Sequence, residues 1–314
     1  MNEHLSKRRF DGTATLACIG ALCFWSLGPN FIEYLTDHLD AWTQNLLRYS
    51  IACLFWLPFL VFSIYAKRLD TRIWRLALLP AAANIIMQSL WAAAFYYIEP
   101  ALMVLLTKTT IIWIAGFSLM FFPEERVLIR SKRFLAGLGL CVVGVVGVLY
   151  FGPGFEAKGT MTGVIIALVC AFMWGMYTVT VRAAFRDIDS RAGFSVISIY
   201  TVVGLSIVAA KYGNVAECLN MGLRPWVVVV ASAVMCIALA HVFYYAAIRR
   251  IGATIPALVI LAQPFAVLAI SYVAFGESLN AFQLIFGVML LIGAALAIWA
   301  QQHLKPRDHT KISS

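Results

Sequence analysis

Long apolar runs alternate with short polar connections along the whole 314-residue chain. A helix rises about 1.5 Å per residue and the hydrocarbon core of a bilayer is about 30 Å thick, so each transmembrane span needs roughly 20 mostly apolar residues. The pattern predicts an all-α integral membrane protein with ten transmembrane helices. They run approximately over Thr13 to Tyr34, Ala41 to Tyr65, Ile73 to Tyr97, Ala101 to Phe122, Phe134 to Phe151, Thr160 to Ala184, Gly193 to Lys211, Pro225 to Ile248, Ala253 to Phe275 and Asn280 to Ala300.

Lys and Arg occupy every second polar connection and are almost absent from the others. Nineteen of the 24 Lys and Arg precede the first span, follow an even-numbered span or follow the last one. The opposite connections hold only Lys158, Lys211 and Arg224, and the two remaining cations, Arg48 and Lys108, lie inside spans. Because cytoplasmic connections carry the excess of Lys and Arg, both termini are expected in the cytoplasm.

Composition and charge agree with this class, since hydrophobic residues make up 62% of the chain and charged residues 12%. The net charge of +9 is explained by a basic rim facing lipid headgroups, so the bilayer is the expected partner and nucleic acid is not. Six of the seven cysteines fall within spans, Cys218 alone is expected to be exposed, and no Cys or His pair has ligand spacing. No disulfide framework, metal site or cofactor is expected.

The two halves of the chain repeat each other. At an offset of 153 residues, Phe-Pro-Glu at 122–124 falls on Phe-Gly-Glu at 275–277, and 90–98 falls on 243–251 with aromatic on aromatic and Ala on Ala. Each half has five spans, an odd number, so the second must enter the membrane in the opposite orientation. The predicted organisation is a first repeat over 1–152, an inverted second repeat over 153–303 and a cytoplasmic tail over 304–314. Inverted repeats favour a secondary transporter with its substrate at the repeat interface.

Aromatic side chains occur midway along several spans. Trp25 and Trp174 lie about 12 and 14 residues into the first span of their halves, close to the midplane at 1.5 Å per residue. Trp91 and Tyr244 are equivalent under the repeat. These rings either pack against neighbouring helices or line a substrate cavity, and we expect the latter.

Polar side chains also lie well inside spans. Asn84 and Gln88 are four residues apart, hence on one helix face, and Trp91 follows at three. His241, the equivalent of Gln88, belongs to the eighth span and Gln263 to the ninth. Because an unpaired amide costs several kcal/mol in hydrocarbon, these groups must face protein or a wet cavity. Interhelical hydrogen bonding is the alternative for each residue, and the paired stripes favour the cavity.

Two cations and two prolines interrupt the apolar pattern. Lys108 lies roughly 10 Å deep in the fourth span, where a cation costs about 2.5 to 3.5 kcal/mol unless hydrated or paired. It either binds a substrate carboxylate or snorkels to the outer surface. Arg48 is expected to pair with Glu33. Pro29 predicts a break or kink in the first span, and Pro264 a hinge in the ninth.

Small residues are enriched in the fifth and tenth spans, which indicates close helix packing. That packing is either internal or between two copies, so both a monomer and a homodimer are expected possibilities. The residues concerned are Gly137, Gly139, Gly144, Gly147, Gly287, Gly293 and Ala297.

These features resemble the drug/metabolite transporter superfamily, whose members have ten spans in two EamA repeats. The resemblance rests on the mid-span Trp25 and Trp174, on Arg48, and on the acidic tails ending at Glu124 and Glu277. Within the superfamily the chain looks most like the YddG-type aromatic amino acid exporters of bacterial inner membranes. That likeness implies a multi-pass inner-membrane protein exporting phenylalanine, tyrosine, tryptophan and related compounds by alternating access. The first half departs from the pattern, because Lys108-Thr109-Thr110-Ile111 stands where Gln263-Pro264 would align.

Other functions remain as alternatives. A broad-specificity drug or quaternary ammonium exporter would also use aromatic walls, whose faces attract cations. An intramembrane enzyme or receptor has less support, because the sequence shows no HExxH, no GxSxG and no convergent acid, base or metal-ligand cluster. Energy coupling stays open between proton exchange and facilitated diffusion, since the spans have no midplane carboxylate and His241 is the deep group with a suitable titration range.

Overall fold

The computed structural model describes residues 12–121, 130–151, 158–185, 188, 190–251 and 259–303. Within these residues every regular element is helical. The elements are α1 (Gly12–Thr36), α2 (Ala41–Tyr65), α3 (Ile73–Leu76), α4 (Leu78–Ala94), α5 (Pro100–Thr107), α6 (Thr110–Phe121), α7 (Lys132–Tyr150), α8 (Lys158–Ala184), α9 (Ser190–Tyr212), η2 (Val215–Asn220), α10 (Leu223–Ala231), the π-helical η3 (Ser232–Leu239), α11 (Ala240–Ile251), α13 (Gln263–Phe275) and α14 (Ala281–His303). Glu124 lies outside the described residues.

Among the described residues, eight helices are long and apolar enough to cross a membrane, which confirms the all-α membrane architecture. They are the first, second, third, fifth, sixth, seventh, eighth and tenth expected spans. The fourth differs, because α5 ends at Thr107 and α6 begins at Thr110. The expectation of one continuous helix there is wrong. The ninth is also shorter than expected in its described part, because α13 begins only at Gln263.

Local sequence signals begin and end several helices. The Asp40 carboxylate accepts from the backbone N–H groups of Trp42 and Thr43 at 2.9 Å, which satisfies free donors at the start of α2. Ser131 caps α7 in the same way by accepting from the Phe134 N–H at 3.3 Å. At the end of α13, Gly276 adopts φ +74°, a left-handed conformation that glycine tolerates best.

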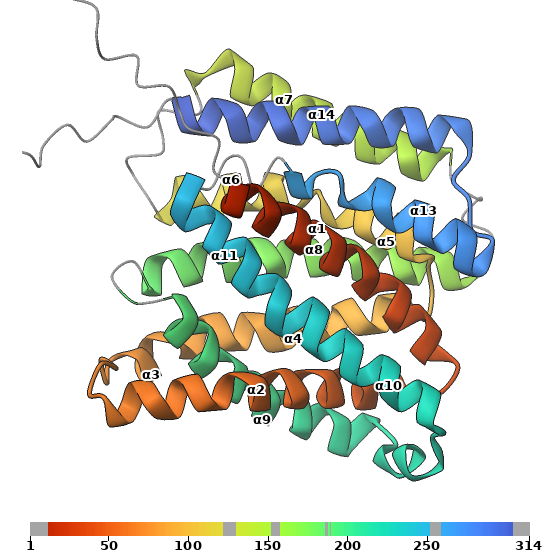
Figure 1. Ribbon diagram of the computed structural model, residues 1–314. Helices are drawn as coiled ribbons and strands as arrows, with labels where there is room; N and C mark the ends of the chain where they lie inside the picture. Colours follow the sequence, from red (N-terminus) through yellow and green to blue (C-terminus); the bar gives the residue numbers. More distant parts are fainter. Residues whose placement is uncertain are drawn as a thin grey trace, which may run out of the picture.

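Eight of the spans form a ring around the centre of the molecule. In order around it, each packing on the next, are α1, the eighth span (α10, η3 and α11), α2, α9, α4, α8, α5 with α6, and α13, which returns to α1. The side on which α1 begins and α14 ends is called the proximal side here, and the opposite side the distal side. Figure 1 shows α1 and α8 running in opposite directions between these sides. The halves are therefore inverted.

The contacts around the ring come in equivalent pairs, as inverted repeats require. α1 packs on the eighth span as α8 packs on α4, and α1 packs on α13 as α8 packs on α6. Three further pairs join equivalent helices of the two halves, namely α2 with α9, α5 with α13, and α7 with α14. These three pairs mark the line about which one half is rotated onto the other.

The helices α7 and α14 lie outside the ring and pack on each other through glycines (Figure 1). A Cβ at Gly144 would lie 2.6 Å from the backbone nitrogen of Leu290, and one at Gly137 would lie 2.8 Å from the carbonyl oxygen of Gly293. The small residues of these spans therefore serve a close contact within one molecule. Gly139 has nothing within 4 Å of such a Cβ and takes no part in this seam.

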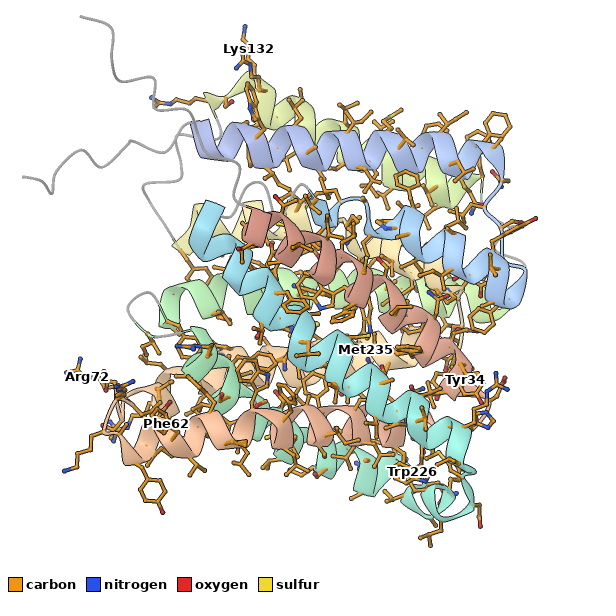
Figure 2. All side chains as sticks on the ribbon, in the orientation of Figure 1. Tyr34, Phe62, Arg72, Lys132, Trp226 and Met235 are labelled. Atoms are coloured by element: carbon orange, nitrogen blue, oxygen red, sulfur yellow. The ribbon has the colours of Figure 1, made fainter. Side chains whose placement is uncertain are left out.

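The outer surface of the bundle is apolar. Leu16 on α1, Leu54 on α2 and Ile207 on α9 are 72%, 64% and 67% exposed, respectively, as side chains facing acyl chains would be. Arg72 and Lys132 project away from the bundle, while Tyr34 and Trp226 lie near its distal end (Figure 2). Cys23 is exposed and Cys218 half-buried, so the expectation that Cys218 alone would be exposed is wrong.

Candidate functional site

The fourth and ninth spans are broken at the same point of the repeat. In the fourth, the Thr109 N–H donates to the Leu106 carbonyl at 3.1 Å, a tight i to i−3 bond that interrupts the α-helix. At the equivalent point of the ninth, the Ala262 N–H donates to the Val259 carbonyl at 3.0 Å. Because α5 packs on α13, the two breaks face each other at the repeat interface.

A chain of hydrogen bonds crosses this interface and links three spans. Lys108 Nζ donates to Gln263 Oε1 at 2.8 Å, and Gln263 Nε2 donates to the carbonyl oxygen of Trp25 at 2.9 Å. The physical origin is Pro29. It stands four residues after Trp25 and has no N–H, so the Trp25 carbonyl lacks its usual i+4 donor within α1. Gln263, itself only 8% exposed, supplies the missing donor from α13.

Of the predictions for the two prolines, only the break at Pro29 is wrong, whereas a kink at Pro29 and a hinge at Pro264 stay predictions. α1 is continuous through Pro29, so the predicted break is absent, and the lost helical bond is replaced by Gln263. Pro264 stands in the first turn of α13, where its missing N–H costs nothing.

Two aromatic groups flank the hydrogen-bonded chain, one in each half of the ring. Trp25 on α1 lies against Tyr244 on α11, with ring centroids 5.0 Å apart. Trp174 on α8 lies edge-on to Trp91 on α4, with centroids 5.8 Å apart. The repeat superposes one pair on the other, and all four rings are partly exposed rather than buried. The aromatic residues expected to line a cavity thus meet in pairs between neighbouring helices of the ring.

The remaining polar candidates separate into two environments. Asn84 is 3% exposed and donates to Thr201 Oγ1 on α9 at 2.8 Å, a hydrogen bond between two helices. Gln88 is half-buried, and its backbone carbonyl accepts from Asn45 Nδ2 at 2.9 Å. His241 lies edge-on to Trp25 and 5.3 Å from it, with its Nδ1 at 2.5 Å from the Ile237 carbonyl. Gln88 and His241 thus stand beside the aromatic pairs.

Arg48 corrects another expectation. Its Nε donates to Ser232 Oγ at 2.7 Å, and it is 4% exposed. Ser232 is the first residue of η3, the π-helical segment that widens the eighth span beside α2. The expected pair with Glu33 does not form, because Arg48 turns toward the eighth span.

Carboxylates gather at the distal end of the ring, where sequence reasoning had proposed no site. A cavity of about 370 Å³ lies there, lined by Glu33, Phe95, Tyr96, Tyr97, Ile98, Glu99, Leu102, Ser278, Leu279 and Gln283. Glu277 precedes one lining residue, and its Oε2 is buried without a hydrogen bond in the described structure. Burial raises the pKa of Glu277 to about 7, and the negative charge of Glu99 acts in the same direction. Burial also raises the pKa of Glu99.

Two features of the site were missed at the level of sequence. The Gln263 bridge was signalled by the Pro29 spacing, because a mid-span proline always leaves the carbonyl four residues earlier in need of a donor. The distal carboxylates belong to α1 and to two different connections, so only the folded ring brings them together.

Comparisons with known proteins agree with this architecture. The sequence model described as the EamA-like transporter family matches residues 12–150 and 161–299. No curated protein matches the chain significantly. A solved structure titled only as the crystal structure of a protein is similar in fold, with a TM-score of 0.64 and 21% sequence identity. The match covers 93% of this chain and 98% of that one.

Proposed function

The chain belongs to the EamA-like transporter family, and on that basis we propose that this multi-pass membrane transporter exports aromatic amino acids across a bacterial inner membrane. Export proceeds by alternating access around a site at the repeat interface. The single observation that carries the proposal is the pair of facing helix breaks bridged by Lys108 and Gln263. Secondary transporters with inverted repeats bind substrate near the midplane at such discontinuous helices.

The polar end of an amino acid suits the bridge. Lys108 bonds a neutral amide, and the described residues provide it with no carboxylate partner. A substrate carboxylate can take the place of Gln263 Oε1 and form the stronger, charge-assisted bond. The Gln88 amide, which lies on the same helix face as Trp91, can accept a hydrogen bond from the substrate ammonium.

The aromatic end suits the flanking rings. Trp25 with Tyr244, and Trp91 with Trp174, present partly exposed faces and edges on both sides of the interface. An aromatic side chain gains about 0.5 to 1.5 kcal/mol per favourable ring contact beyond its area burial. An amino acid held by Lys108 through its carboxylate would therefore prefer an aromatic side chain.

Substrate binding would also couple to motion. When a carboxylate replaces Gln263 on Lys108, the bridge from α5 to α13 is released while Gln263 still holds the Trp25 carbonyl. The fourth span then moves independently of the first and ninth. This sequence of events accounts for access that alternates between the two sides.

Flux in vesicles tests the substrate. Liposomes that contain the purified protein and are loaded with labelled phenylalanine or tryptophan should release the label faster than loaded liposomes without the protein. Unlabelled tyrosine should compete with the labelled amino acid. Labelled alanine serves as the control for ring recognition. Equal rates for alanine and phenylalanine, or no protein-dependent flux of either, would remove aromatic amino acids as substrates.

The distal cavity favours one rival, a transporter of cationic drugs or quaternary ammonium compounds. Glu33, Glu99 and the two tyrosines of the cavity offer charge and ring faces to a cation. The discriminating measurement is competition, in which tetraphenylphosphonium is added to phenylalanine flux. We expect little inhibition. Complete inhibition together with flux of the cation itself would favour the rival.

The proposed orientation places both termini in the cytoplasm and the distal side outside. Cys218 lies in η2, on the distal side, and is half-buried. A membrane-impermeant maleimide added to intact spheroplasts should label Cys218 and should not label the Cys218→Ser variant. Labelling that appears only after the membrane is opened would reverse the orientation.

A further inference from the structure

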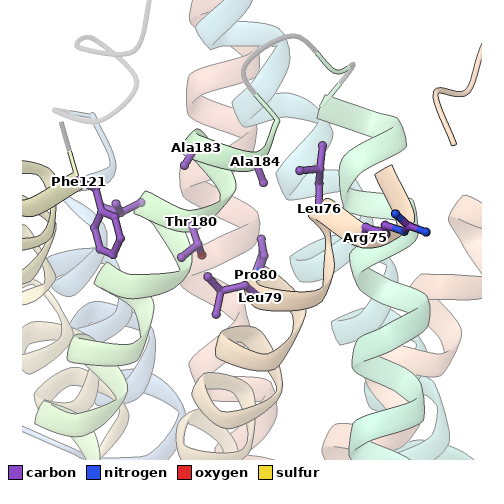
Figure 3. A pocket seen from close by; sticks show the side chains of 9 residues that line it. Arg75, Leu76, Leu79, Pro80, Phe121, Thr180, Ala183 and Ala184 are labelled. Atoms are coloured by element: carbon purple, nitrogen blue, oxygen red, sulfur yellow. The ribbon is translucent and has the colours of Figure 1, made fainter. Parts of the chain in front are cut away.

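A groove of about 350 Å³ lies at the proximal end of the ring, between α4 and α6, with α8 as its floor (Figure 3). Leu76 and Leu79 form one wall and Phe121 the other. The groove exists because the α8 surface beneath it ends in two alanines, Ala183 and Ala184, whose side chains leave the space unfilled. It is separate from the bridge and from the distal cavity.

The groove opens toward the lipid-facing side of the helices. Its wall residues Leu79 and Phe121 are 58% and 56% exposed. Further along the same helix as its floor, Ile165 and Val169 are 54% and 42% exposed and are apolar, as lipid-facing positions must be. A concave apolar surface within the hydrocarbon layer gains dispersion contacts when an acyl chain fills it.

A basic side chain stands at the rim. Arg75 lines the groove and is exposed, its side chain projects away from Leu79 and Phe121 (Figure 3), and no described residue provides its guanidinium with a hydrogen bond or ion pair. The preceding connection adds Lys67, Arg68 and Arg72 against one acid, Asp70, whose carboxylate accepts from the Arg72 N–H at 2.9 Å. The connection beside this wall of the groove is therefore net positive, and basic pockets between helices at the membrane surface suit anionic lipid headgroups.

From these observations we propose that the groove is a binding site for one anionic phospholipid. An acyl chain lies between Leu79 and Phe121 over the two alanines, and the headgroup phosphate is bound by Arg75. Arginine suits this role because its planar fork can bind two phosphate oxygens together. The site binds a structural or regulatory lipid, whichever substrate the transporter carries.

Native mass spectrometry of the purified protein tests the site, with dioleoyl phosphatidylglycerol and dioleoyl phosphatidylcholine as probes. One charge near the surface contributes about 1 kcal/mol, so the wild type should retain one phosphatidylglycerol about fivefold better than phosphatidylcholine. Arg75→Gln should lose that preference, and Arg75→Lys should keep most of it. Ala183→Trp fills the groove and should lower the retention of both lipids.

Matched controls separate this site from general charge and bulk. Arg72→Gln removes an exposed cation of the same connection that does not line the groove, and Ala210→Trp adds the same bulk at an exposed position on α9. Both should behave like the wild type, and size-exclusion profiles verify the fold of every variant.

Three results would overturn the proposal. The wild type could retain both lipids equally, or Arg75→Gln could retain the full preference. Alternatively, Ala183→Trp could keep its phosphatidylglycerol while losing phenylalanine flux, which would make the groove a lateral entrance for substrate.

Discussion

The fourth and ninth spans break at equivalent points, yet the first half places Lys108 where the second places Leu261, and Thr110 where the second places Gln263. The backbone bonds at the two breaks are the same. The hydroxyl of Thr110 donates to the Ala171 carbonyl on α8 at 3.1 Å, as Gln263 donates to Trp25 on α1. The scaffold therefore repeats, whereas the cation appears once. The repeat symmetry accounts for the helix packing of this molecule. The departure from that symmetry at Lys108 places a cation in the first half and none at the equivalent position of the second.

The largest test makes the two breaks alike. Lys108→Leu places leucine at both positions and removes the proposed carboxylate partner. A hydrogen bond to a charged group contributes about 1.5 to 3 kcal/mol, so the variant should lose about 10- to 100-fold in the flux ratio kcat/KM for phenylalanine. The measurement is initial flux in proteoliposomes. Leu261→Met, a similar change at the equivalent position, should stay within about twofold of wild type. Equal losses in both would show that the site is symmetric.

The second test compares the aromatic pairs. Trp25 contacts two rings, Tyr244 and His241, while Trp174 contacts Trp91. Because each ring contact with an aromatic substrate is worth about 0.5 to 1.5 kcal/mol, Trp25→Ala and Trp174→Ala should each raise KM for phenylalanine by about two- to tenfold. Concentration-dependent flux gives both values. If phenylalanine KM is unaffected while alanine is still rejected, the rings do not contact the substrate.

The third test concerns the carbonyl that Pro29 leaves free. Gln263→Leu should destabilise the protein by about 1 to 3 kcal/mol, because the buried Trp25 carbonyl loses its donor. In a Pro29→Ala background the helix supplies that donor itself, so the same substitution should cost about 1 kcal/mol less. Thermal unfolding in detergent of the four proteins of this cycle measures the difference. Purely additive effects would mean that Gln263 does not compensate for the proline.

The smallest expected effect is at the distal carboxylates. The pKa of Glu277 is raised from 4.5 to about 7 in the folded protein, so the wild type loses stability as the pH rises through this interval. Glu277→Gln removes the titration. The variant should gain about 2 °C in Tm at pH 8 and nothing at pH 5. A gain of the same size at both pH values would mean that the ionised carboxylate is not the cause. Glu217→Gln, at a half-buried carboxylate of η2, serves as the control.

The sequence was sufficient for the membrane topology and for the inverted repeat, because both depend on where apolar runs, cations and aromatic residues recur. It was not sufficient for the hydrogen bonds within the membrane. The break in the fourth span falls at Lys108 and Thr109, which interrupt the apolar run. A polar group inside a span is equally compatible with a continuous helix, so the sequence did not specify the break. Likewise, η3 contains ordinary helix-forming residues, and the approach of Ser232 to Arg48 depends on the packing of α2 against the eighth span.

The candidate site residues divide in the same way, into those that the sequence could identify and those whose partners it could not. Trp25, Trp91, Trp174 and Tyr244 could be chosen as a group because the repeat relates them, and the structure places them in two equivalent contacts. Arg48 could not be paired correctly, since the sequence does not specify whether its side chain turns toward Glu33 on α1 or toward Ser232 on the eighth span. Long-range pairing of this kind depends on tertiary packing, which a single sequence does not specify.

The three equivalent helix pairs have a consequence for the origin of such a molecule. If two identical copies of one half came together, residues near the shared line would meet their own copies. A lysine at position 108 would then lie close to a second lysine from the other copy, and two cations in a low-dielectric interior repel strongly. Two unlike halves on one chain avoid this conflict. Joining the two halves in a single polypeptide allows them to differ in sequence, so that Lys108 is present in one half without a second lysine at the equivalent position of the other.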